Sequence, residues 1–137
     1  MIKKFIHQFA SPKTYLYQVS RAYPYILFIS LFIYISSIFW GLFLTPEDFV
    51  QGNSYRIIYL HVPASFISQS LYAGMAFASV IFLVWKVKLS AYLIKSIAPI
   101  GAITTFIALV SGSIWGIPTW GTWWAWDARI TSMLILA

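Results

Sequence analysis

The sequence predicts an all-α, polytopic integral membrane helix bundle, and its composition, its hydropathy and its long uncharged runs support that prediction. Of the 137 residues, 61% are hydrophobic and only 9% are charged, whereas a soluble domain carries about a quarter charged residues. The mean hydropathy of +0.80 also excludes a disordered chain, since disorder requires low hydrophobicity and high charge. We therefore expect one membrane domain over residues 1–137, with three full spans and the start of a fourth.

Four apolar segments account for the predicted spans. The first covers residues 24–44 without a charge, roughly 32 Å as a helix, and its length favours a retained anchor over a cleaved signal peptide. The second covers residues 57–85, where Pro63 supplies a reason for a bend. The third covers residues 96–117. The fourth, residues 130–137, only begins, because a span needs about 20 residues, so we expect the chain to be cut inside a helix.

Basic residues alternate between the segments that flank the spans. The amino-terminal segment, residues 1–22, has four Lys and Arg, and the connection 86–95 has three. The loop 45–56 and the segment 118–129 have one each. Cytoplasmic loops carry the excess of Lys and Arg, so we expect the amino terminus to be cytoplasmic and the 118–129 segment to face outward. The net charge of +6 thus reports orientation, and no basic stripe points to nucleic acid.

A dense group of tryptophans follows the third span. Its members, all within twelve residues, are Trp115, Trp120, Trp123, Trp124 and Trp126. One interpretation is an aromatic belt at the headgroup level. The other is an apolar platform for a planar ligand such as a porphyrin, since flat rings stack on flat partners. Asp127 and Arg129 at its edge are expected either to form a solvated salt bridge or to orient the segment and meet ligand carboxylates.

His61 lies inside the second span, roughly 6 Å below its outer end and on the same side as the tryptophans. Ionisable residues inside spans are costly and often functional, and neutral imidazole is a good iron ligand. The alternative is a histidine that is hydrogen-bonded within the bundle or that snorkels to the lipid headgroups. His7, before the first span, lies on the other side of about 30 Å of bilayer and is expected to be solvent-exposed.

Other motifs point away from catalysis. The sequence has no cysteine, so it offers no disulfide, no thiolate site and no covalent heme attachment. It has no phosphate loop, nucleophile elbow or intramembrane carboxylate, so hydrolytic enzymes and proton pumps rank low. We expect no enzyme activity. The pairs Gly112 with Gly116 and Gly74 with Ala78 suit close helix packing.

Two motifs resemble a known family. The segment Trp120–Ser132, W-G-T-W-W-A-W-D-A-R-I-T-S, resembles the signature of tryptophan-rich (WWD-domain) heme-handling proteins, and its ending is most similar to the heme exporter protein C type (CcmC) of cytochrome c maturation. The segment Arg56–Ala64 contains H-V-P and resembles a second motif of that family. The match covers the chain from about residue 20.

The resemblance implies a six-span protein of the bacterial inner membrane that binds non-covalent heme b at its outward face and passes it to a periplasmic heme chaperone of the CcmE type. It also implies partners of the CcmA and CcmB types, which form an ABC transporter, and a small membrane partner of the CcmD type. His61 would be one axial iron ligand, and a second histidine would lie in a later outward loop. The implied heme-contacting residues are Trp115, Trp120, Trp123, Trp124, Trp126 and Asp127.

Two rival functions stay open at this point. The first is a structural subunit of a transporter complex whose tryptophans only anchor it at the membrane interface. The second is a solute or heme channel.

Overall fold

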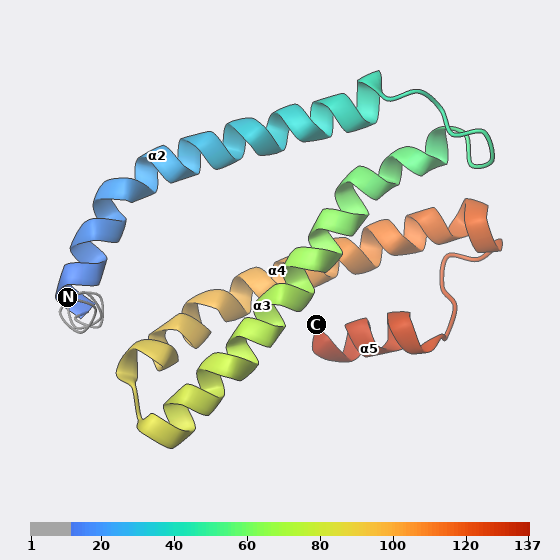
Figure 1. The fold of residues 1–137 in the computed structure, drawn as a ribbon. Coiled ribbons are helices and arrows are strands. Elements are labelled where there is room, and N and C mark those ends of the chain that lie inside the picture. The colour runs from blue at the N-terminus through green and yellow to red at the C-terminus, as the bar shows by residue number, and fades with distance from the viewer. Residues whose placement is uncertain (1–11) are drawn as a thin grey trace. The chain divides into compact units, whose positions relative to one another are not determined.

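The computed structural model describes residues 12–137, and this part of the chain is helical with no β-strand (Figure 1). The prediction of an all-α fold is therefore confirmed. Three of the helices are long and apolar enough to cross a membrane. The basic residues Lys3 and Lys4 and the predicted solvent-exposed His7 lie outside the described residues. The chain divides into two compact units, residues 1–37 and 38–137, which we describe separately.

The first unit contains most of helix α2, Pro12–Phe39. The candidate span is Leu16–Leu44, with a mean hydropathy of 2.2. Helix α2 begins twelve residues before the predicted span and includes Pro24 in its interior. A proline removes only one hydrogen bond from a helix, and the apolar residues that follow continue it. A short π-helical turn, Trp40–Leu44, then ends the span.

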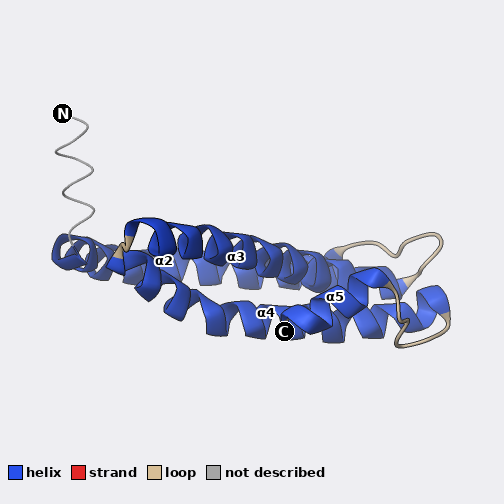
Figure 2. Ribbon diagram, turned by 90° about the horizontal axis from the view of Figure 1, so that it is seen from below, coloured by secondary structure: helices blue, strands red, loops and turns tan. Residues whose placement is uncertain are grey.

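The second unit is built on an antiparallel hairpin of helices α3, Ile58–Trp85, and α4, Lys88–Trp120 (Figures 1 and 2). Only Lys86 and Val87 connect them, and Lys86 adopts the left-handed conformation (φ 55°) while its N–H bonds to the Phe82 carbonyl at 2.9 Å. The predicted connection 86–95 is thus mostly helical. The hairpin places the loop before α3 and the segment after α4 at the same end of the unit.

Small side chains form the contact between α3 and α4. Ala64, Ala78 and Ala108 are buried, and the buried hydroxyls of Ser68 and Thr105 bond to each other across the two helices. In lipid, helices associate through close packing and interhelical hydrogen bonds, because lipid tails are as apolar as the side chains. This seam holds the hairpin together.

The predicted glycine pairs behave differently. A Cβ at Gly112 or Gly116 would crowd neighbouring atoms, whereas Gly74 has nothing within 4 Å. Gly112 packs against His61 of α3 as predicted, whereas the atoms near Gly116 belong to Trp120 and Thr122 and not to a partner helix. Of the pair Gly74 with Ala78, only the alanine is buried.

Helix α4 continues through Pro118 and ends after Trp120. Gly121 terminates it with φ 72°, and its N–H bonds to the Ile117 carbonyl at 3.0 Å. A glycine adopts this left-handed conformation without the steric cost of a Cβ. The connecting segment is therefore residues 121–127, which we call the tryptophan loop, and it is shorter than the predicted 118–129. Helix α5, Ala128–Leu136, follows it, which agrees with a fourth helix beginning near residue 130. A 3₁₀ turn, Asn53–Ile57, precedes α3.

Candidate ligand site between helices α3, α4 and α5

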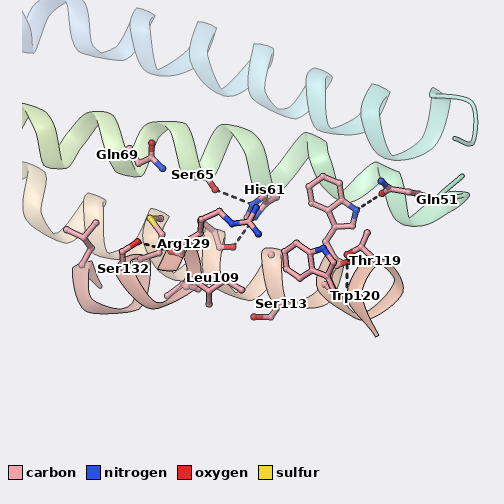
Figure 3. Close-up of a pocket in the computed structure, with 17 residues that line it drawn as sticks. Gln51, His61, Ser65, Gln69, Leu109, Ser113, Thr119, Trp120, Arg129 and Ser132 are labelled. Carbon is pink, nitrogen blue, oxygen red and sulfur yellow. Dashed lines mark hydrogen bonds between the residues drawn. The ribbon is translucent and has the colours of Figure 1, made fainter. Parts of the chain in front are cut away.

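A cavity of about 680 Å³ lies within the second unit (Figure 3). Its volume falls in the range of about 300–1,000 Å³ that small-molecule and cofactor sites occupy. Helices α3, α4 and α5 and the loop before α3 all contribute to its wall. The residues of the wall include Gln51, His61, Ser65, Gly112, Trp115, Trp120 and Arg129.

His61 is the central polar group of the cavity wall. Its Nδ1 lies 3.0 Å from the Ala108 carbonyl oxygen and 3.2 Å from Ser111 Oγ. Its Nε2 lies 3.5 Å from Ser65 Oγ, which is at the outer limit of a hydrogen bond. The expectation of a histidine bonded within the bundle is met at Nδ1, while Nε2 has only this weak contact. The imidazole is thus held by one nitrogen and offers the other.

Gly112 makes room for the imidazole. A Cβ built on Gly112 would lie 2.8 Å from His61 Cε1 and 3.2 Å from Nδ1, closer than side chains normally approach. The sequence predicts helix packing for Gly112 and no other role. The structure adds that the missing side chain admits the His61 ring against α4.

Trp115 lies beside His61, with ring centres 5.8 Å apart and planes at 66°. Such an edge-to-face arrangement is favourable for aromatic rings. The Trp115 indole Nε1–H donates to Gln51 Oε1 at 2.8 Å (Figure 3). This bond ties α4 to the loop before α3. Gln51 was missed from sequence, because a glutamine in a polar loop has no pattern that singles it out.

Trp120 and Arg129 complete the outer part of the wall. The Arg129 guanidinium lies 5.4 Å from the centre of the Trp120 ring, within the range of a cation–π contact. Arg129 Nη2 also bonds to Asp127 Oδ2 at 2.8 Å. The predicted salt bridge is therefore present, and Arg129 lines the cavity as well.

Asp127 is the N-cap of helix α5. Its Oδ1 accepts from the Ile130 backbone N–H at 2.9 Å. This hydrogen bond, and next the bond from Arg129, lower the pKa of the Asp127 carboxyl below its ordinary value. Asp127 therefore fixes the start of α5, which agrees with the expectation that it orients the segment.

The remaining tryptophans, Trp123, Trp124 and Trp126, lie in the tryptophan loop, and none of them lines the cavity. Trp123 and Trp124 have ring centres 5.9 Å apart at 49°, and Trp124 and Trp126 are 5.5 Å apart at 73°. These tilts mean that the three rings do not share one plane. The side chains of Trp123 and Trp126 are 66% and 78% exposed. The predicted cluster is thus divided: Trp115 and Trp120 face the cavity with His61, and three indoles pack on one another in the loop.

The chemistry that this wall supports is ligand binding by a single imidazole. Within residues 12–137, no three His, Cys, Asp or Glu side chains converge in the way that a protein-held metal ion requires. A metal carried by a ligand can still bind His61, because such a ligand supplies its other donors. A heme is such a ligand, since imidazole binds its iron along the axis.

Comparisons with known proteins give a consistent result. The family model described as Heme exporter protein C (CcmC) matches residues 5–137. The chain is 51% identical over 134 residues to Heme exporter protein C of Escherichia coli (strain K12) and 45% identical over 133 residues to the protein of that name from Haemophilus influenzae. Each match covers 97% of the chain and 54% of the relative.

A relative from a plant gives a shorter match. The chain is 49% identical over 105 residues to a putative cytochrome c biosynthesis ccmC-like mitochondrial protein of Marchantia polymorpha, and this match covers 77% of the chain and 46% of the relative. The chain therefore spans about half the length of the curated relatives it matches.

Proposed function

The chain belongs to the heme exporter protein C family, and from this membership we propose that it binds heme and presents it for export during the maturation of c-type cytochromes. The family is one of transporter components. We therefore assign the chain a binding and transfer role and no catalytic role.

One observation carries the proposal. His61 faces a cavity large enough for a cofactor, and only one nitrogen of its imidazole is firmly hydrogen-bonded to the protein. Iron-binding histidines bind the metal through one ring nitrogen, while the other bonds to a backbone carbonyl or a carboxylate that orients the ring. The Nδ1 contact with the Ala108 carbonyl at 3.0 Å fits that second role. We assign Nε2 to the axial position of a heme iron.

The rest of the wall suits a porphyrin. Trp115 and Trp120 offer apolar ring surface, and Arg129 offers a positive charge for a ligand carboxylate. Trp123, Trp124, Trp126 and Asp127 then act at the outer rim, where the loop indoles cover exposed ligand and Asp127 holds the loop. The 137 residues include no cysteine, so they offer no thioether bond to a heme, which agrees with the proposal that they hold heme b non-covalently and can release it. A transfer site requires both binding and release.

The hairpin also supports an outward-facing site. It places the tryptophan loop at the end opposite Lys86 and Lys88, and lysine-rich loops favour the cytoplasm. We propose a multi-pass protein of the bacterial inner membrane with this cavity toward the periplasm. The receiver is then a periplasmic heme chaperone of the CcmE type. CcmA- and CcmB-type transporter subunits and a CcmD-type membrane protein complete the assembly.

A second function is favoured by the exposure of Trp123 and Trp126. Indoles exposed to this degree suit the headgroup region, and a subunit that uses them only as an interfacial anchor needs no ligand. The two functions differ at His61. A heme-binding protein uses its imidazole as an iron ligand, whereas an interfacial anchor does not need it.

Hemin titration of the detergent-purified protein separates the two functions. We expect a Soret band that shifts as hemin binds and that weakens or moves in His61→Ala. The matched control is His7→Ala, which removes an imidazole predicted to lie on the other side of the membrane and leaves the spectrum unchanged. Wild-type protein that develops no Soret shift, or a His61→Ala variant with the wild-type spectrum, contradicts the assignment.

A further inference from the structure

We propose that Ser111 is a positioning residue that fixes His61 in one tautomer, with the proton on Nδ1 and the lone pair on Nε2. Ser111 lies on α4, one turn before Trp115, and its side chain is 4% exposed. The tautomer follows from the hydrogen bonds around His61. Its consequence for heme rests on the proposed function.

The direction of the bonds follows from what each partner can donate. Ser111 Oγ lies 2.6 Å from the Ile107 carbonyl and 3.3 Å from the Ala108 carbonyl. A carbonyl only accepts, so the single hydroxyl proton is directed to one of these two oxygens. Ser111 Oγ therefore reaches His61 Nδ1, at 3.2 Å, as an acceptor.

The second partner of Nδ1 also requires a proton on this nitrogen. The Ala108 carbonyl oxygen, 3.0 Å away, also only accepts. Two acceptors facing one ring nitrogen require that this nitrogen carry the proton. In a neutral imidazole the other nitrogen then keeps its lone pair. Nε2 is thereby prepared to bind a metal before any ligand arrives.

Ser65, at the opposite edge of the imidazole, can be compared with Ser111. Ser65 Oγ lies 3.5 Å from Nε2, and its hydroxyl proton has no other hydrogen-bond acceptor in the described residues. Ser65 can donate to a lone pair on Nε2, but this long contact does not select the tautomer. Ser65 and Ser111 therefore present the same chemical group to the two nitrogens, with different predicted consequences.

The backbone carbonyl alone could hold the ring, which would leave Ser111 a purely structural role within α4. Serine hydroxyls often bond to the carbonyl four residues earlier in a helix, as Ser111 does to Ile107. The distinction needs a measurement on the imidazole itself rather than on folding or on export.

The tautomer can be read without heme by ¹⁵N NMR of the histidine-labelled, ligand-free protein, with His61 assigned from its loss in His61→Ala. We expect the Nδ1–H form in the wild type and a measurable Nε2–H fraction in Ser111→Ala. Ser111→Thr keeps the hydroxyl and restores the wild-type signal, and Ser65→Ala leaves the tautomer unchanged. A Ser111→Ala spectrum that matches the wild type overturns the inference.

Hemin titration tests the consequence. Loss of a group that orients a metal-binding histidine typically lowers affinity about 10–100-fold. Since the Ala108 carbonyl remains, we expect about a tenfold loss in Ser111→Ala, with recovery in Ser111→Thr. The matched control is Ser79→Ala, because Ser79 on α3 also bonds to the carbonyl four residues earlier, at 2.8 Å, and lies outside the cavity wall; it should keep the wild-type affinity. Equal losses in Ser111→Ala and Ser79→Ala contradict a specific role for Ser111.

The two proposals fail separately. If His61→Ala binds hemin as the wild type does, His61 is not the ligand and the proposed function fails, although the tautomer measurement still tests Ser111. If His61→Ala loses hemin while Ser111→Ala keeps the wild-type tautomer and affinity, only the inference about Ser111 fails.

Discussion

The cavity wall and the tryptophan loop hold their aromatic side chains by different means. In the wall, each ring has a polar partner on another segment: His61 bonds to α4, Trp115 bonds to Gln51, and Trp120 has a cation–π contact with Arg129. In the loop, the three indoles contact mainly one another at tilted angles. Trp124 Nε1 there is buried without a hydrogen-bond partner in the part of the chain that the structure describes.

This difference indicates that the cavity wall and the tryptophan loop contribute to binding in different ways. A ring locked by hydrogen bonds and packing presents one geometry to a ligand, as a binding site with fixed orientation requires. Exposed indoles without such bonds offer contact area that adjusts to a partner. We infer that the wall determines how a ligand is oriented and that the loop adds contact area and a surface for the protein that receives the ligand.

The largest expected effect on hemin affinity comes from Gly112→Ala, a substitution in the cavity wall. The added Cβ would lie 2.8 Å from His61 Cε1, so the ring must move and its Nδ1 bonds must weaken. Disturbing the groups that orient a metal-binding histidine costs about 10–100-fold in affinity, and we expect a loss in that range by hemin titration. Overpacking of this kind also destabilises a protein by about 1–3 kcal/mol.

Gly74→Ala is the matched control, because it makes the same change in the partner helix. Gly74 has nothing within 4 Å of the built Cβ, and alanine is the better helix former by about 1 kcal/mol. Affinity for hemin should stay at the wild-type value and stability should not fall. Similar losses in the two variants would show that helix propensity or folding, rather than the His61 contact, explains the result.

A smaller effect is expected when the loop is changed by the double substitution Trp123→Ala and Trp124→Ala. A stacked ring is worth about 1–3 kcal/mol against a planar partner. Tilted rings present edges as well as faces, so we expect about 1 kcal/mol for the pair, roughly a fivefold weaker Kd. Membrane insertion should be intact.

The control for this pair is Trp40→Ala with Trp85→Ala, since both indoles are exposed to the same degree as Trp123 and neither lines the cavity. It should leave hemin affinity unchanged. If the loop pair costs more hemin affinity than Gly112→Ala, the loop rather than the wall dominates binding.

The number of candidate spans and the end of the hairpin at which His61 lies can be predicted from the sequence, because they depend on hydropathy and charge averaged over many residues. The apolar lengths fix three candidate spans, and the hairpin that follows from them brings His61 and Trp115 to the same end. The contact of their rings confirms that expectation. Hydropathy and loop charge are sums over many residues, so single exceptions do not alter the result.

The division of the tryptophans did not follow from the sequence. It depends on α4 continuing through Pro118 to Trp120, where the predicted span had stopped at residue 117. Gly121, with its positive φ, sets the end of the helix. A one-turn difference decides whether Trp120 faces the cavity or belongs to the loop, and local propensity does not resolve it. Ser111 and Gln51 likewise gain their roles only from neighbours on other segments.

The smallest effect concerns the joint between the two regions, where Asp127 caps α5. Its pKa is lowered first by the Ile130 N–H and then by Arg129, so the carboxylate stabilises the cap at any pH above the ordinary value of about 3.9. That contribution is lost as the pH falls through the lowered pKa of the folded protein. The Ile130 amide resonance should therefore titrate with a midpoint below about 3.9.

Asp127→Asn supplies the control for this titration, because an asparagine can still cap the helix but cannot ionise. Its Ile130 resonance should stay constant over the same pH range, and hemin binding at neutral pH should change little, since the carboxylate lies outside the cavity wall. A wild-type midpoint at or above about 3.9 would mean that the cap bond does not favour the ionised carboxylate.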